Sequence, residues 1–125
     1  MISWDRVSSL ISEEDWFAAF SYVLDRGMLS DVSELMRLTG PRPEVLSTSL
    51  LNRLYDTIAA MLLKSSNSEQ CVIWVLAVTR SDRTREFSLD VVKKLVAGLI
   101  SVASKVSKRG LLAALLASKL SRALR

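Results

Sequence analysis

Apolar residues recur at helical spacing along almost the whole chain. Trp4, Val7 and Ile11 lie three or four positions apart, which is the spacing that places side chains on one face of a helix. The same spacing returns in six later segments. The pattern therefore predicts seven helices, whose apolar positions span residues 4–11, 16–24, 32–38, 46–62, 71–78, 91–106 and 111–124.

Residues that start and stop helices separate these segments. Ser12, followed by the acids Glu13–Asp15, is typical of an N-cap with acids in the first turn and predicts the start of the second helix. Gly27 and Gly40 suit the ends of the second and third helices, and Pro41-Arg42-Pro43 is a clear linker. Later boundaries are predicted at Ser68 as the cap of the fifth helix, at Thr84 or Ser88 as the cap of the sixth, and near Gly110 as its end.

The apolar run Cys71–Val78 also fits a buried strand, because it is continuous and rich in β-branched residues. No partner strand is found elsewhere in the sequence, so a helix is favoured. Short connections imply antiparallel neighbours. We predict a single all-α domain over residues 1–125, with about seven antiparallel helices in a bundle or an ARM/HEAT-like α-solenoid stack, although no repeat of fixed period is visible. We expect it to be the C-terminal module of a larger protein.

Composition narrows the class of protein. The 125 residues are 50% hydrophobic and include four Gly and two Pro, which supplies one core and excludes a disordered or collagen-like chain. The apolar runs are far shorter than the roughly 20 residues that span a bilayer. The N-terminus lacks the pattern of a signal peptide. A single cysteine indicates a reducing compartment, so we expect a soluble, cytoplasmic protein that makes no membrane contact.

A search for catalytic chemistry finds nothing specific. The sequence has no histidine, which excludes His-based triads and His metal sites. It also has no Gly-rich phosphate loop. The contiguous acids Glu13–Asp15 point in different directions on a helix and fit a solvated helix start. Cys71 lies in an apolar run and is interpreted as a buried, inert thiol. We predict a protein that is not an enzyme and that uses no cofactor or metal.

Charge is divided unevenly along the chain. Residues 1–90 carry nine Lys/Arg and thirteen Asp/Glu, whereas residues 91–125 carry eight Lys/Arg and no acid. This asymmetry indicates an acidic partner, with an ordinary solvated face as the alternative. The basic segment has no aromatic residue for base stacking, which favours an acidic or helical peptide over RNA and leaves weak, non-specific RNA contact open. The predicted basic patch consists of Lys93, Lys94, Lys105, Lys108, Arg109, Lys119 and Arg122.

The segment 111–124 is apolar over more than half of its circumference. A core helix needs only one apolar stripe, so two interpretations stay open. The helix is wedged between others, or it exposes a strip that binds another chain or a second copy of this one. The candidate apolar interface consists of Leu111, Leu115 and Leu116. The tryptophans are expected to anchor the core and are Trp4, Trp16 and Trp74.

Short motifs follow one another in an order found in a known family. They are Ala19-Phe20 before Val23-Leu24, then Met28–Val32, then Ser47, Leu50, Leu51 and Leu54 as a Ser-x-x-Leu-Leu-x-x-Leu helix, then Thr84-Arg85-Glu86, and last the basic, leucine-rich Leu111–Leu124. In this order the chain resembles, as a divergent relative, the C-terminal helical domain of the enhancer-of-mRNA-decapping scaffold family, the large WD-repeat proteins of processing bodies. The C-terminal domain of the WD-repeat regulatory subunit of katanin is also similar in element order and basic ending.

The first resemblance implies a helical interaction and assembly module that binds decapping factors and the 5′-exonuclease in processing bodies, without catalysing a reaction. It also implies self-association as an additional property. It transfers no site residue, because the shared motifs are core positions. The katanin-like alternative implies binding to an ATPase subunit. A basic helical RNA-binding domain is the third reading, and it rests on the charge pattern alone.

Overall fold

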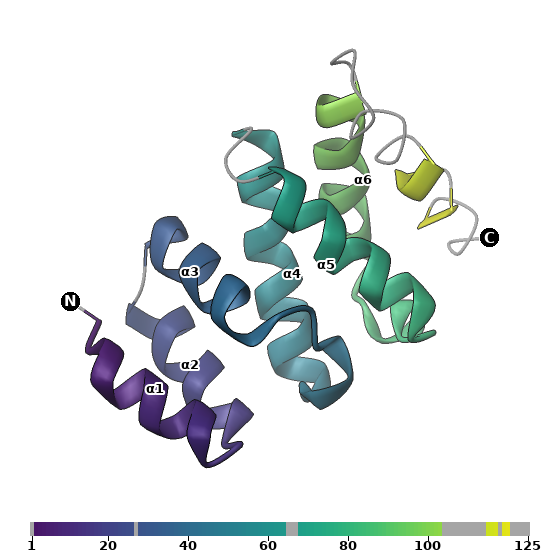
Figure 1. The fold of residues 1–125 in the computed structure, drawn as a ribbon. Helices are drawn as coiled ribbons and strands as arrows, with labels where there is room; N and C mark the ends of the chain where they lie inside the picture. The colour runs from purple at the N-terminus through teal and green to yellow at the C-terminus, as the bar shows by residue number, and fades with distance from the viewer. Residues whose placement is uncertain (1, 27, 65–67, 104–114, 118, 121–125) are drawn as a thin grey trace.

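The computed structural model describes residues 2–26, 28–64, 68–103, 115–117 and 119–120, which form helices joined by short connections (Figure 1). No strand occurs among these residues, which confirms the predicted all-α fold and places Cys71–Val78 in a helix. In the same part of the chain, no helix is both long enough and apolar enough to cross a membrane. The elements are α1 (Trp4–Ser12), α2 (Trp16–Arg26), α3 (Leu29–Thr39), η1 (Pro43–Val45), α4 (Thr48–Leu63), α5 (Ser68–Arg80), η2 (Thr84–Glu86) and α6 (Leu89–Ala103), where η marks a 3-10 helix.

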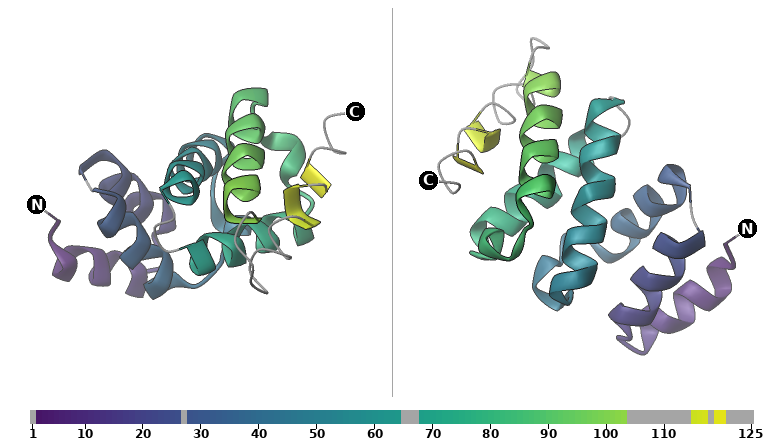
Figure 2. Two further views of the ribbon diagram at one scale, coloured as in Figure 1. Left: turned by 90° about the horizontal axis from the view of Figure 1, so that it is seen from above. Right: turned by 180° about the vertical axis from the view of Figure 1, so that it is seen from behind.

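Consecutive helices form successive units, which we call pairs: α1 with α2, α3 with α4 and α5 with α6. These pairs follow one another along the stack of the described chain (Figure 1). Figure 2 shows from two further sides that the second helices of the pairs lie next to one another. The contacts agree, since α4 packs against both α2 and α6, while α3 packs against α5. This is the arrangement of an α-solenoid stack, in which each pair contacts its neighbours.

A residue with left-handed backbone follows the first helix of each pair. The φ angles are 58° at Glu14, 70° at Gly40 and 59° at Asp82. A left-handed residue just after a helix turns the chain sharply and redirects it toward the second helix of the pair. Gly40 adopts this conformation without the steric penalty of a Cβ atom, and it ends the third helix as predicted.

One predicted helix start is wrong. Ser12 is the last residue of α1, and α2 is capped instead by Asp15. The Oδ1 atom of Asp15 accepts a hydrogen bond from the Ala18 amide at 3.2 Å, which satisfies one of the free N–H groups in the first turn of α2. The other predicted helix ends at Gly27 and Gly110 lie outside the described residues.

The second and third pairs are related by a repeat of 41 residues. Ser47 and Ser88, which are 41 positions apart, each cap a second helix, accepting a hydrogen bond of 3.3 Å from the amide three residues later. Ser88 is therefore the cap of α6, whereas Thr84 begins η2. Buried residues follow the same register, in the pairs Leu46/Phe87, Leu50/Val91, Leu51/Val92, Leu54/Leu95, Ile58/Leu99 and Met61/Val102. The repeat escapes a search for sequence identity because the paired residues share apolar character but mostly differ in type.

The first helices of the pairs bury residues at a shared spacing as well. Near its end, α3 buries Leu35, Met36 and Thr39, and α5 buries Trp74, Val75 and Val78 at the same intervals. The helical residues 115–117 and 119–120 repeat these intervals with Leu116, Ala117 and Leu120, all of which join the core. These described residues thus bury side chains at the same spacing as α3 and α5.

Trp74 lies at the centre of the core. Its side chain is fully buried, and its ring packs edge-on against Phe20 of α2 and Tyr55 of α4, with ring centroids 6.1 and 6.4 Å away. The Tyr55 hydroxyl donates a hydrogen bond of 2.7 Å to the Trp74 carbonyl oxygen. The predicted role of Trp74 as a core anchor is confirmed, while Trp4 and Trp16 are half-buried and pack against the edge of the core.

Helices α6 and α4 approach each other closely at Gly98. A Cβ atom at this position would lie 2.8 Å from the Leu62 Cβ and 3.2 Å from the Ala59 carbonyl oxygen. Both neighbouring atoms belong to α4 and lie on or next to its backbone, so neither moves easily. The absence of a side chain at Gly98 therefore sets the distance between the two helices.

Replacing Gly98 with alanine is expected to destabilise the fold by about 1 kcal/mol, because the overpacking outweighs the better helix propensity of alanine. The measurement is the free energy of unfolding in urea. Lys93→Ala, on the exposed side of the same helix, is the control and is expected to change it by less than about 0.5 kcal/mol. A Gly98→Ala variant more stable than the wild type would contradict the close approach.

Candidate protein-interaction surface

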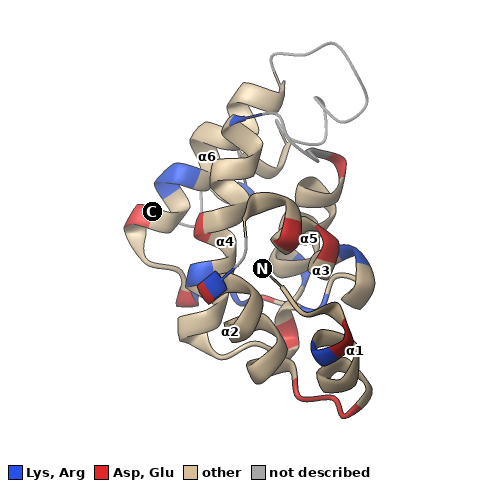
Figure 3. Cartoon of the chain, turned by 90° about the vertical axis from the view of Figure 1, so that its left-hand side faces the viewer, with Lys and Arg blue, Asp and Glu red and all other residues tan. Residues whose placement is uncertain are grey.

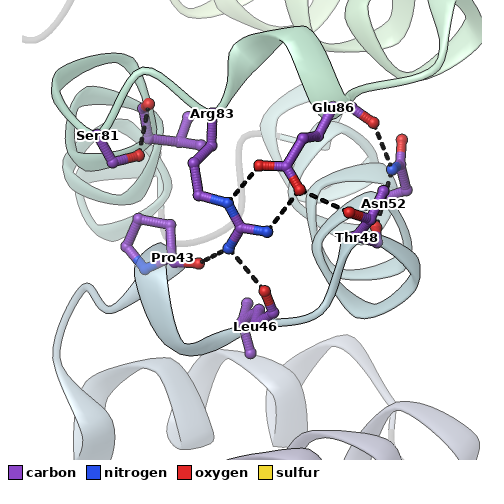
Figure 4. Close-up of polar contacts among 8 residues, drawn as sticks. Pro43, Leu46, Thr48, Asn52, Ser81, Arg83 and Glu86 are labelled. Atoms are coloured by element: carbon purple, nitrogen blue, oxygen red, sulfur yellow. Dashed lines mark hydrogen bonds and ion pairs between the residues drawn. The ribbon is translucent and has the colours of Figure 1, made fainter.

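A polar cluster joins the connection between α3 and α4 to the connection between α5 and α6. We call the connection between the two helices of a pair its corner. The Arg83 guanidinium donates hydrogen bonds to both carboxylate oxygens of Glu86, with an Nη2–Oε1 distance of 2.7 Å. It also donates to the backbone carbonyl oxygens of Pro43 and Leu46, the latter at 2.6 Å (Figure 4). One side chain thus holds η2 against η1. Because the donors are charged and the group is largely shielded from water, these bonds are stronger than neutral ones.

Asn52 of α4 completes this cluster from the other side. Its Nδ2 donates to the carbonyl oxygens of Thr48 and Glu86, each at 2.9 Å, and its Oδ1 accepts from the Ser88 amide at 2.7 Å. The Thr48 hydroxyl also donates to the Glu86 carboxylate (Figure 4). The start of α6 is therefore fixed to the first turns of α4. This sets the direction in which α6 lies along α4.

The corner of the second pair has a similar arginine. Arg42, which is 41 positions before Arg83, donates from Nε to the Thr39 carbonyl oxygen at 2.8 Å. Its guanidinium lies 5.1 Å from the ring centroid of Trp16, at the start of α2. In both corners an arginine reaches back onto the preceding pair, by a cation–π contact in one case and by hydrogen bonds in the other.

Ion pairs connect the exposed sides of the second helices. Asp25 of α2 pairs with Arg53 of α4 at 2.6 Å, and Asp56 of α4 pairs with Lys94 of α6 at 2.9 Å. Arg53 and Lys94 are again 41 positions apart. Lys94 also contacts Asp90 at 3.1 Å. Figure 3 shows acidic and basic residues next to one another on these helices. The side chains that pair between helices are about half exposed, so each pair adds little stability, but together they fix which sides of the helices face each other.

The predicted basic patch divides into residues with different surroundings. Lys94 is held in two ion pairs, so its charge is used within the stack. Lys93 and Lys119 are exposed, and the described part of the structure shows no ion pair for either of them. The remaining members lie outside the described residues, and their role in binding stays a prediction: Lys105, Lys108, Arg109 and Arg122.

The candidate apolar interface is only partly supported. Leu115 is 69% exposed, as an interface residue would be. Leu116 is buried in the core beside Ala117 and Leu120, so its assignment to an exposed strip is wrong, and for this residue the wedged-helix interpretation holds. Leu111 lies outside the described residues. The helical phase explains the difference, because adjacent positions on a helix point about 100° apart.

An exposed stripe on α6 was not predicted from the sequence. It consists of Leu89, Lys93, Ala97 and Ile100, which recur at helical spacing and lie away from the buried side of the helix. Leu89 is 55% and Ile100 57% exposed. The signal in the sequence is that both apolar residues fall outside the buried series Val91, Val92, Leu95, Leu99 and Val102. We call these four residues the α6 stripe.

The other residues considered for catalysis or metal binding are Cys71 and the acids Glu13–Asp15. Cys71 is buried as predicted, and burial raises the pKa of its thiol to about 12, which keeps it protonated near neutral pH. Among Glu13–Asp15, Glu14 takes the left-handed turn position and Asp15 caps α2. The described residues contain no group of three or more acids or cysteines that is arranged to hold a metal ion.

Comparison of the chain with protein-family profiles, with curated proteins and with solved structures finds no match. The surface geometry and the sequence motifs therefore carry the functional argument.

The polar cluster is expected to make the free energy of unfolding depend on pH. Hydrogen bonds from Arg83, and next from Thr48, lower the pKa of Glu86 to about 2 from the ordinary value of 4.5. The stabilisation from the charged carboxylate is complete above pH 4.5 and is lost as the pH falls through about 2. Glu86→Gln is therefore expected to unfold more easily than the wild type near neutral pH, and the difference in midpoint is expected to shrink toward pH 2.

Thermal melts of both proteins across this range test the prediction. Glu13→Gln, which removes one exposed carboxylate at the α1–α2 corner, controls for the change in net charge. A difference between wild type and Glu86→Gln that stays constant down to pH 2 would show that Arg83 does not hold the carboxylate in its charged form.

Proposed function

We propose that this domain is a non-catalytic protein-interaction module that assembles decapping factors and the 5′-exonuclease on an mRNA-decay scaffold. The observation that carries the proposal is the stack of helix pairs, in which the polar corners and ion pairs fix neighbouring helices and leave the side of α6 exposed. Stacked helix pairs of this kind present extended surfaces for other proteins. The order of motifs in the sequence resembles that of the decapping scaffold family. This resemblance is the reason for proposing a role in mRNA decay.

The proposal places the domain in the cytoplasm and in processing bodies, as for the family it resembles. Self-association is part of the same proposal, because Leu115 exposes apolar surface that a second copy can cover. Catalysis is no part of it, since the whole sequence lacks histidine and the one thiol is buried.

A pull-down with purified decapping and 5′-exonuclease components tests this function. Combining Lys105→Glu, Lys108→Glu and Arg109→Glu is expected to reduce the recovered partners at least about tenfold, because the acid-free segment 91–125 would lose much of its positive charge. The matched control is the combination Arg37→Glu, Lys64→Glu and Arg80→Glu, which reverses exposed charges elsewhere.

Each result has a defined meaning. If the wild-type chain recovers none of these components, the decapping function is wrong. If it recovers the helices of an ATPase subunit instead, the katanin-like alternative takes its place. If the first triple variant keeps every partner at physiological salt, the basic segment is an ordinary solvated surface.

Contact with RNA is the second candidate, and the charge of residues 91–125 favours it. Binding to a single-stranded RNA oligonucleotide should then weaken with salt, with a log–log slope of about −0.7 for each phosphate neutralised. Fluorescence anisotropy over a range of salt concentrations measures this slope. A flat response, or no binding at low salt, would exclude the RNA function.

A further inference from the structure

The repeat shows which side of a second helix holds the next pair. In α4 this side carries Thr48, Asn52, Asp56 and Ala59. Thr48 and Asn52 contact η2 and the start of α6, Asp56 contacts Lys94, and Ala59 lies against Gly98. The four residues lie three or four positions apart, so they form one stripe along the helix. We call this the forward side of α4, because it faces the pair that follows in the stack.

The α6 stripe is the forward side of α6. Adding 41 positions to the four residues of α4 leads to Leu89, Lys93, Ala97 and Ile100. In α4 the corresponding Ala59 is 1% exposed and Asn52 is half-buried, because α6 and η2 cover them. In α6 all four residues are exposed. The side is therefore covered at Asn52 and Ala59 in α4, where only Thr48 is exposed, and it is open at all four positions in α6.

The residue types on this side also change between the repeats. Thr48, Asn52 and Asp56, which are polar, are replaced by Leu89, Lys93 and Ala97. Together with Ile100, the change from polar to apolar residues gives this side of α6 an apolar surface that a partner can cover. Leu89 and Ile100 thus stand at the two ends of the stripe with the small Ala97 between them, which leaves room for a helix to approach closely.

Charge identifies what fits against the stripe. In the covered interfaces, an acid on the forward side pairs with a base on the next helix, as Asp25 does with Arg53 and Asp56 with Lys94. The α6 stripe has no acid and offers Lys93, while the neighbouring Lys94 is already paired. The complementary surface must therefore bring a carboxylate. A helix with an apolar face and an acidic border satisfies both requirements.

We propose that the α6 stripe docks an acidic amphipathic helix of a partner protein, which lies along α6 as α6 lies along α4. The apolar face of the partner covers Leu89, Ala97 and Ile100, and one of its carboxylates pairs with Lys93. This docking site rests on the proposed interaction function and gives it a location and a partner chemistry.

The test uses the full chain and a synthetic amphipathic helical peptide with a leucine face bordered by glutamates. Fluorescence anisotropy of the labelled peptide measures affinity. Ile100→Ser is expected to weaken binding about tenfold, because it removes one of the two large apolar anchors of the stripe. The matched control is Ile73→Ser on α5, where the isoleucine is 44% exposed and lies outside the stripe, and it is expected to bind as the wild type does.

A charge exchange tests the carboxylate pair. Lys93→Glu is expected to weaken binding of the glutamate peptide and to strengthen binding of a peptide with lysines in place of its glutamates. Melting curves of all variants establish that they are folded. Unchanged affinity in both Ile100→Ser and Lys93→Glu would overturn the proposal, and so would equal loss in Ile73→Ser.

Light scattering separates the remaining alternative. If the wild-type chain forms a dimer that Ile100→Ser dissociates, the stripe binds a second copy, and the acidic partner helix is wrong. Because the peptide carries no decapping-factor sequence, its binding tests the docking site independently of the pull-down. If the pull-down recovers no decapping partner but the peptide still binds, the role in mRNA decay is wrong and the docking site on α6 is supported.

Discussion

The packing of α6 along α4 is the contact on which the rest of the structure depends. It requires Gly98, because a Cβ atom there would lie 2.8 Å from Leu62. Once the helices approach this closely, Asn52 can bridge to the Ser88 amide, and Arg83 can reach the carbonyl oxygens of the preceding corner. The polar cluster thus fixes the direction in which one helix pair follows another, while buried apolar residues supply most of the stability.

This geometry gives different roles to charges that look alike in the sequence. Lys93 and Lys94 are neighbours, yet Lys94 pairs with Asp56 and Asp90, whereas Lys93 stays on the open side of α6. The difference follows from the helical phase, because adjacent residues point about 100° apart. A surface for binding therefore consists of the charges and apolar residues that the stack leaves unused. On α6 these are Leu89, Lys93, Ala97 and Ile100.

Much of the fold can be predicted from periodicity alone. The apolar spacing locates the helices, and the left-handed Gly40 and the buried Trp74 agree with the pattern. The cap at Asp15 cannot be distinguished from Ser12 in this way, because both residues are good caps and only the length of α1 decides between them. The repeat is hidden because packing preserves apolar character at positions such as Leu46 and Phe87 and not the residue type.

The candidate site is harder to predict than the fold. Asp56 lies 38 positions from Lys94, and only the tertiary structure brings them together. Likewise, the burial of Leu116 and the exposure of Leu115 depend on which side of the helix meets the core. The charge asymmetry of residues 91–125 predicts an acidic partner, but it does not say which cations are free to bind one.

The most direct test of the account is an NMR titration of the isotope-labelled chain with the helical segment of a decapping factor that the pull-down recovers. The account predicts that amide shift changes concentrate between Leu89 and Ile100 of α6 and stay small in α1 and α2. Changes confined to α1 and α2, with α6 unaffected, would contradict the claim that the open forward side of the last described pair is where this stack binds its partner.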